Sequence, residues 1–266
     1  MLDFDFEYDG VCLSDLGYII CSFDDKTESV LDGSQITFNQ TSIMMGKHHL
    51  LANAKYEECL KTEFDICKSD CMGNQENLYI TSYEEQEIRR WLNRKSFHKF
   101  RFLSERFEDT YFIGSFDVQT KEFCGNVIGL HLSFVSDSPF GYTDVIYKFD
   151  ITEDKNTYTI YDLSDEEGDN YIDVFITCKS SGDLEIKNLF NNKKTIIKNC
   201  SAGEEISISN LIIESSLDSH EQNIMNDFNF VFPQISNTFL ERKNTFMFSL
   251  PCSVTFKYKE LRKIGI

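Results

Sequence analysis

The stretch that decides the fold is VIGLHLSFV, residues 127–135. Its apolar side chains alternate with small or polar ones: Ile128, Leu130, Leu132 and Phe134 are interleaved with Gly129, His131 and Ser133. Successive side chains of a β-strand point to opposite faces of its sheet, so this period of two predicts a strand with one buried face. The segment LDFDFEY, residues 2–8, repeats the pattern with an aromatic face.

The same signal runs along the rest of the chain. Further strands are predicted over 18–23, 60–66, 100–102, 111–118, 145–152, 156–162, 171–178, 183–189, 194–198, 205–213 and 244–258. In the second half, turn residues separate the strands roughly every 8–12 residues, which is typical of a β-sandwich. The turn-rich segment 138–142 breaks the pattern, so a domain boundary is expected near 140–146. We predict a mainly β protein with two domains, the second of which is a β-sandwich.

One helix interrupts the strands of the first half. Ser82 precedes Glu85 by three residues, the spacing of a capping box. Acidic residues stand early and basic residues late, an order that suits the helix dipole. We expect a helix over about 82–95, with Trp91 anchored in the core against a sheet and with Arg89, Arg90 and Arg94 on the solvated side.

Charge argues against nucleic-acid binding. Lys and Arg number 26 and Asp and Glu number 44, which gives a net charge of −18. Residues 1–145 contribute −12 and residues 146–266 contribute −6. Binding to DNA or RNA requires a basic surface, and no dense stripe of Lys and Arg is present. The simplest role of the acidic excess is solubility.

Targeting signals and a disulfide framework are not apparent. The first ten residues, MLDFDFEYDG, are acidic, and no stretch approaches the about 20 apolar residues of a membrane-spanning helix. We therefore expect synthesis in a cytoplasm and no membrane partner. The scattered cysteines are expected to be reduced thiols: Cys12, Cys21, Cys59, Cys67, Cys71, Cys124, Cys178, Cys200 and Cys252.

Recognisable motifs for catalysis, phosphate binding or metal binding are missing from the sequence. The histidines lie outside any nucleophile motif, and His131 is expected on a sheet face: His48, His49, His98, His131 and His220. Phosphate-binding glycine loops are not present either. We predict no catalytic residue, no cofactor and no metal site.

Three weaker patterns remain as alternatives. Cys67 and Cys71 resemble half of a zinc site, but no second ligand pair accompanies them. The loop 162–169 offers hard oxygen ligands that suit calcium, although Gly168 is one place late for an EF-hand: Asp162, Asp165, Glu166, Glu167 and Asp169. A solvated acidic loop is the simpler interpretation. A pair of glycosidase carboxylates cannot be located from spacing alone.

Several segments occur together in a familiar order. FEYDG (6–10) is followed by SDLGY (14–18), EQEIRRWLNRKSFHKFRF (85–102) precedes YFIG (111–114), and GLHLSFVSDSPFGY (129–142) closes the first half. IMNDFNFVFPQI (224–235) is a fainter match in the second half. This ordered set resembles the distal tail protein family of tailed phages of Gram-positive bacteria.

The resemblance implies a fold and a structural role. It implies that residues 1–142 form a β-sandwich plus helix that closes into a hexameric ring. Residues 143–266 would form a galectin-like, jelly-roll-like sandwich that projects outward. The protein would be a non-enzymatic virion component at the tail tip, made in the bacterial host cytoplasm. The implied partners are the other copies of the homo-hexamer, the tail tube protein, the tail-tip hub or tail-associated lysin protein, and the receptor-binding protein, with DNA only passing through the lumen.

Other functions stay open at this point. One is a carbohydrate-binding adhesin module, which would need an aromatic platform on a sandwich face. Another is the equivalent hub of a contractile tail or a phage-derived particle. If a ring forms, we expect acidic side chains to line its hole and repel passing DNA. The loops 24–35 and 68–77 are the candidates for that lining.

Overall fold

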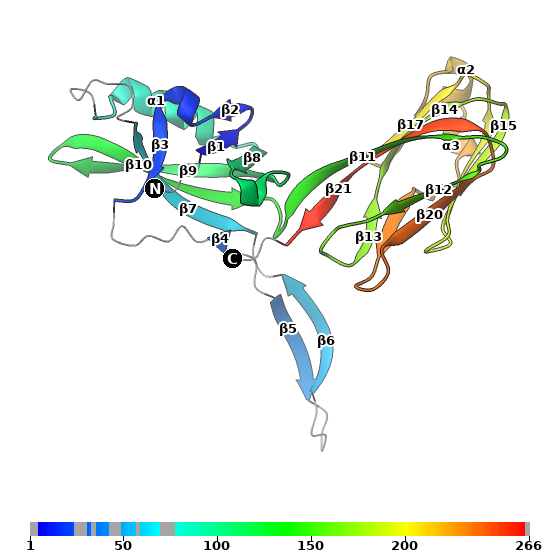
Figure 1. Ribbon diagram of the computed structural model, residues 1–266, viewed down its shortest axis with the longest axis horizontal. Helices are drawn as coiled ribbons and strands as arrows, with labels where there is room; N and C mark the ends of the chain where they lie inside the picture. Colours follow the sequence, from blue (N-terminus) through cyan, green and yellow to red (C-terminus); the bar gives the residue numbers. More distant parts are fainter. Residues whose placement is uncertain are drawn as a thin grey trace. The chain divides into compact units, whose positions relative to one another are not determined.

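The protein is divided into two compact units. The computed structural model describes residues 5–23, 31–32, 36–42, 49–56, 59–69 and 78–263. The first unit is Met1–Tyr142 together with Arg262–Ile266, and the second unit is Thr143–Leu261 (Figure 1). Both are built mainly from β-strands, and one main helix lies in the first unit, which confirms the predicted fold class.

The first unit is built on an eight-stranded antiparallel sheet. Its order is β2-β1-β8-β9-β10-β7-β3, and β4 also pairs with β7. The register at the centre places Leu132 opposite Val118 on one side and Phe64 on the other, so the apolar face is continuous across strands. The strands are β1 (Asp5–Tyr8), β2 (Val11–Cys12), β3 (Tyr18–Cys21), β4 (Leu31–Asp32), β7 (Lys61–Lys68), β8 (His98–Leu103), β9 (Phe112–Phe123) and β10 (Asn126–Ser136).

A tight turn joins the two longest strands of this sheet. Cys124 and Gly125 link β9 to β10 with positive φ angles of 51° and 80°. Two consecutive positive φ values match the right-handed twist of a hairpin, and glycine adopts them without strain. The turn leaves the Cys124 thiol exposed.

Helix α1 (Ser82–Leu92) packs against the apolar face of this sheet, with Ile88 and Leu92 buried in the shared core (Figure 1). Its capping box is formed by Thr81 and Glu84, not by Ser82 and Glu85 as the sequence suggested. Thr81 takes the capping role because its backbone is extended, with φ −75° and ψ 159°. The helix ends at Leu92, three residues before the predicted end.

Trp91 anchors the helix to the sheet, as predicted. Its ring is partly buried and stacks on Phe6 with 5.7 Å between centroids, and its Nε1 donates a 2.9 Å hydrogen bond to the Tyr8 carbonyl. The prediction of a purely solvated basic side is wrong for two arginines. Arg89 donates to the Val118 carbonyl, and Arg94 pairs with Asp9 at 2.8 Å.

Aromatic rings fill the space between helix and sheet. Phe100 is fully buried at the centre of this cluster. Its ring centroid lies 4.6 to 6.1 Å from the rings of Phe6, Phe102, Phe112, Phe116 and Phe134. Pairs at these separations gain energy beyond simple burial.

A separate hairpin belongs to the same unit. It consists of β5 (Ile36–Ser42) and β6 (His49–Tyr56), which pair with each other. No strand was predicted for this region from the sequence. Ile36, Phe38 and Leu51 are all exposed, so neither face of the hairpin shows the buried period that identifies a strand.

The second unit is a β-sandwich. Its five-stranded sheet has the order β11-β21-β14-β17-β18, its four-stranded sheet has the order β12-β20-β15-β16, and a ribbon pairs β13 with β19. Buried residues from both larger sheets form one core. The strands are β11 (Gly141–Ile151), β12 (Thr157–Tyr161), β13 (Gly168–Tyr171), β14 (Asp173–Cys178), β15 (Gly182–Asn188), β16 (Lys194–Cys200), β17 (Glu205–Ser209), β18 (Ile212–Ser215), β19 (Gln234–Asn237), β20 (Lys243–Phe248) and β21 (Cys252–Arg262).

Three predicted segments of the second half differ from the structure. The segment 205–213 spans two strands, because Asn210 and Leu211 form a turn with positive φ. The segment 244–258 is broken between β20 and β21 at 249–251. The segment 214–240, for which the sequence predicted no strand, contains the short helices α2 (Asp218–Glu221) and α3 (Ile224–Asp227) and strand β19.

Candidate functional site

The sheet of the first unit has a polar face opposite the helix. Asp65 on β7 is only 8% exposed, and its carboxylate contacts Lys121 Nζ and His131 Nδ1, each at 2.7 Å. His131 therefore lies on a sheet face, as predicted, and is held by a carboxylate. The charges of this group are mixed, so it is suited to fixing the sheet and does not form a surface of one sign.

An apolar groove runs beside helix α1. Its volume is about 350 Å³. Exposed side chains form part of its lining, including Leu16 at 45% and Tyr83 at 71%. Glu84 and Glu87 give the groove an acidic rim. With the exposed apolar residues of the β5–β6 hairpin, it offers the first unit apolar surface that is open to a partner.

A buried carboxylate ties the helical segment of the second unit to the sandwich. Glu204 is fully buried and accepts from Ser201 N at 2.7 Å and Ser215 Oγ at 2.6 Å, and His220 Nδ1 lies 2.5 Å away. Burial raises the pKa of Glu204, but these hydrogen bonds and the contact with His220 outweigh it and hold the pKa below its ordinary value.

Two carboxylates of the acidic loop considered as a possible calcium site have protein partners in the structure. Asp162 is buried and accepts from Ser164 and Asn237, whereas Asp169 contacts Ser236 and pairs with Lys193 at 2.9 Å. These contacts lower the pKa of Asp169, the hydrogen bond from Ser236 being the largest cause. Both carboxylates are thus committed to protein partners.

The described side chains do not form a metal site. Among the residues that the structure describes, no group of three or more His, Cys, Asp or Glu side chains is arranged to hold a metal ion. Cys67 lies beside Cys21, with a hydrogen bond between the thiols, and Cys71 lies outside the described residues. His48 and most of the loops 24–35 and 68–77 also lie outside the described residues.

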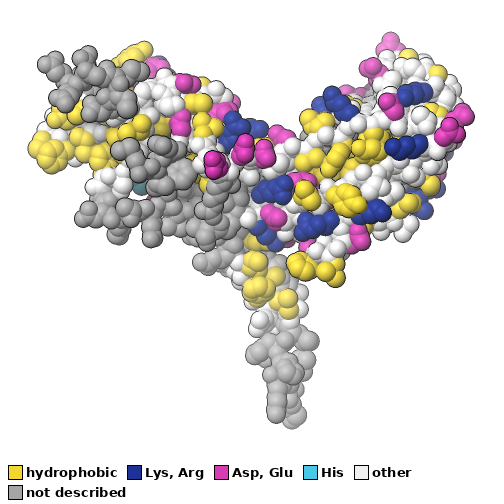
Figure 2. All heavy atoms as spheres, viewed as in Figure 1, with side chains coloured by type: hydrophobic (Ala, Val, Ile, Leu, Met, Phe, Trp, Pro, Cys, Tyr) yellow, Lys and Arg dark blue, Asp and Glu magenta, His cyan; other side chains and the backbone are white. Residues whose placement is uncertain are grey.

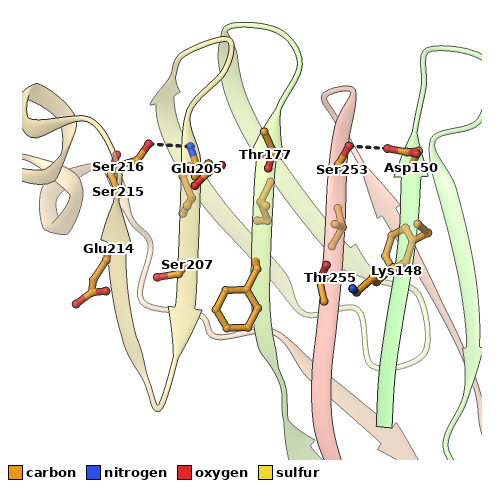
Figure 3. A pocket seen from close by; sticks show the side chains of 15 residues that line it. Lys148, Asp150, Thr177, Glu205, Ser207, Glu214, Ser215, Ser216, Ser253 and Thr255 are labelled. Atoms are coloured by element: carbon orange, nitrogen blue, oxygen red, sulfur yellow. Dashed lines mark hydrogen bonds between the residues drawn. The ribbon is translucent and has the colours of Figure 1, made fainter.

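The five-stranded sheet of the second unit carries a broad hollow. It has a volume of about 700 Å³ and is lined by side chains from all five strands (Figure 3). Lys148 and Asp150 stand on β11 and Glu214 on β18, at the two sides of the hollow. Its lining combines polar residues with the apolar residues Phe149, Phe175, Ile176, Ile206 and Val254. The polar ones are Lys148, Asp150, Thr177, Glu205, Ser207, Glu214, Ser215, Ser216, Ser253 and Thr255. The site could not be predicted from the sequence, because these residues are distant in the chain and come together only through the pairing of the strands.

The visible surface of the second unit mixes charges. Figure 2 shows Lys and Arg side chains interspersed with Asp, Glu and hydrophobic ones on that face. This arrangement does not provide the continuous basic surface that phosphate binding requires. None of the helices that the structure describes is long and apolar enough to cross a membrane.

Comparison with known proteins gives a consistent result over the whole length. Residues 2–138 match the family model described as a phage tail protein N-terminal domain, and residues 140–258 match a phage tail C-terminal domain. No curated protein sequence matches significantly.

A solved structure has a similar fold. It is the crystal structure of the SPP1 Dit (gp 19.1) protein, described as a paradigm of the hub adsorption apparatus in phages that infect Gram-positive bacteria. The TM-score is 0.67 over 96% of this chain and 98% of that chain, at 13% sequence identity.

Proposed function

Since this chain belongs to the phage tail proteins and has the fold of a distal tail protein, we propose that six copies form a ring at the distal end of a phage tail. The family and the fold are those of a structural tail component. The observation that carries the proposal is the end-to-end structural match, which covers both units of this chain and almost all of the SPP1 protein.

The two units have different roles in this proposal. Residues 1–142 form the ring and join the tail tube to the tip, and residues 143–266 project outward and anchor receptor-binding proteins. The exposed apolar side chains of the β5–β6 hairpin and the groove beside α1 support a ring-forming role for the first unit, because both would gain by burial against a second copy. The protein acts as a connector and not as an enzyme.

We also propose that the acidic excess of the first half faces the ring lumen. Six chains of net charge −18 concentrate negative charge around a hole through which DNA passes. The basic residues of α1 support this, since each is already neutralised: Arg89 by Glu85, Arg90 by Glu87 and Arg94 by Asp9. A lumen lined mainly by Lys and Arg in an assembled ring would refute the idea.

Light scattering on the purified chain tests the assembly. The expected result is a particle of six times 31.0 kDa, seen by negative-stain imaging as a ring with a central hole. Immunogold labelling of virions should place the protein at the tail tip. Monomers alone at tens of micromolar, together with virions that lack a ring at the tip, would contradict the proposal.

A further inference from the structure

The hollow on the five-stranded sheet is organised in rows that cross the strands. Phe175 on β14 is paired directly with Thr255 on β21 and with Ser207 on β17. Ser207 is paired in turn with Glu214 on β18. Neighbouring strands lie about 4.8 Å apart, so this row sets an aromatic ring, two hydroxyls and a carboxylate across roughly 15 Å of surface.

A second row runs beside the first. Thr177, two residues after Phe175, is paired with Ser253 on one side and Glu205 on the other. Side chains two residues apart share a sheet face, so both rows open into the same hollow. Figure 3 shows Thr177, Ser207, Glu205 and Thr255 on the strands around an unlabelled phenyl ring.

Several hydrogen-bonding groups in these rows are unused. Ser253 donates to Asp150, and Ser216 Oγ accepts from the Glu205 amide, so these two hydroxyls have protein partners. In contrast, five side chains of the hollow make no hydrogen bond through their oxygens within the described part of the chain. They are Thr177, Ser207, Thr255, Glu205 and Glu214. Hydroxyls both donate and accept and carboxylates accept, so the hollow can satisfy many hydroxyl groups of a ligand.

The phenyl ring supplies the apolar element. Phe175 is half-buried, and the Lys257 ammonium lies over its ring, 4.7 Å from the centroid. A ligand that stacks on Phe175 must therefore use the other face of the ring or displace this ammonium. An aromatic face surrounded by hydroxyls and carboxylates complements a molecule that has an apolar face and a rim of hydroxyls, as a sugar ring does. The charges of the lining are mixed: Lys148 lines the hollow together with Glu205 and Glu214, and Asp150 is paired with Lys179. The two unpaired carboxylates favour ligand hydroxyl or amino groups over phosphates.

We propose that this face of the second unit binds a saccharide chain that is neutral or carries amino groups. Phe175 stacks on one sugar ring, the Thr255 and Ser207 hydroxyls bond the sugar beside it, and the Glu205 and Glu214 carboxylates accept from sugar hydroxyls. The inference does not depend on ring formation, so either proposal can fail without the other.

Titration of the full chain tests this directly. The probes are maltotetraose, cellotetraose, chitotetraose and chitosan tetramer, with polyphosphate as the anionic comparison, measured by calorimetry and saturation-transfer NMR. We expect at least one saccharide to bind and polyphosphate not to bind. Phe175→Ala should weaken the binding about tenfold or more, and Glu205→Gln with Glu214→Gln should weaken it further.

Matched variants keep the result interpretable. Phe239 is 76% exposed and does not line the hollow, so Phe239→Ala should leave saccharide affinity unchanged. An unchanged thermal transition of Phe175→Ala shows that the sandwich remains folded. The proposal is overturned if none of the saccharides binds, if Phe175→Ala binds as well as the parent, or if Phe175→Ala instead abolishes attachment of a receptor-binding protein while saccharide affinity stays the same.

Discussion

The hydrophobic cores of the two units differ in the side chains that fill them. In the first unit, half of the buried core residues are aromatic, and they surround Phe100 beneath a single helix. In the second unit, the core is mostly Ile, Val, Leu and Cys, and buried polar groups are far more frequent. These polar groups are Asp162, Ser164, Asn188, Thr195, Glu204, His220, Gln234, Ser236, Asn237, Asn244 and Glu260.

This difference separates two sources of stability. The packing of aromatic side chains depends on volume and contact. The free energy of unfolding of the first unit should therefore fall strongly when an aromatic residue is truncated and change little with pH. The second unit positions its loops with buried hydrogen bonds, which are costly to break because a lone polar group is left without a partner.

The largest effect is expected for Phe100→Ala. Phe100 is fully buried and contacts five aromatic rings, so its removal should lower the free energy of unfolding of the first unit by about 3–5 kcal/mol. Trp91 is the only tryptophan and lies in this unit, so its fluorescence during urea unfolding reports the change. Phe239→Ala, at a side chain 76% exposed, is the control. Equal midpoints for both variants would show that the aromatic cluster does not determine stability.

Asn244→Ala should affect the second unit alone. Asn244 is fully buried, accepts from Asn188 Nδ2 at 2.8 Å and Ser236 N at 2.9 Å, and donates to the Ser236 carbonyl at 2.8 Å. The variant leaves both backbone groups of Ser236 unpaired, which should cost about 2–4 kcal/mol. Amide hydrogen exchange should become faster in the second unit. The unfolding midpoint of the first unit, reported by Trp91 fluorescence, should stay at the parent value. Uniform destabilisation of both units would argue against independent cores.

Acid should weaken the second unit through Glu204. Its pKa is held below the ordinary value of 4.5, so its contribution to stability is present above about pH 4.5 and is lost as the pH falls further. Glu204→Gln should lower stability at neutral pH by about 1–3 kcal/mol and flatten the acid limb of the profile. Calorimetric melts between about pH 3 and pH 6 measure this. If stability falls with decreasing pH as steeply in the variant as in the parent, protonation of Glu204 does not cause the loss of stability in acid.

The smallest effect on folding is expected at the hairpin. Phe38 is 55% exposed, so Phe38→Ser should change the free energy of unfolding by less than about 0.5 kcal/mol. If the hairpin contacts a neighbouring copy, the same variant should reduce the fraction of rings seen by light scattering. Thr37→Ser, on the adjacent residue, is the control. Rings that form equally in both variants would exclude Phe38 from the subunit contact.

Elements with a buried face could be predicted from the sequence. The alternation in 127–135 identifies β10, an interior strand of the sheet, because one side of it meets the helix and the other meets polar groups. Helix α1 could be found from its apolar spacing and its capping residues, but its cap was misplaced by one position. Thr81 and Ser82 are both good caps, and only the backbone conformation distinguishes them.

Features that depend on pairing between distant residues could not be predicted. The β5–β6 hairpin is exposed on both faces, so its sequence has no period of burial. The turn at Asn210 and Leu211 was missed because apolar alternation continues on either side of it. The hollow requires the register of β14 with β17 and β21, which places Phe175 beside Ser207 and Thr255 although these residues are far apart in the chain.

The exposed turn at Cys124 has a practical consequence for imaging. Of the cysteines in the described part of the chain, Cys124 is the exposed one, and the others are buried or half-buried. A maleimide dye should therefore react there first, at the tip of a rigid hairpin and away from the core. Complete labelling would give each copy one fluorescent reporter on a known loop, and the number of photobleaching steps of a particle would then count its copies.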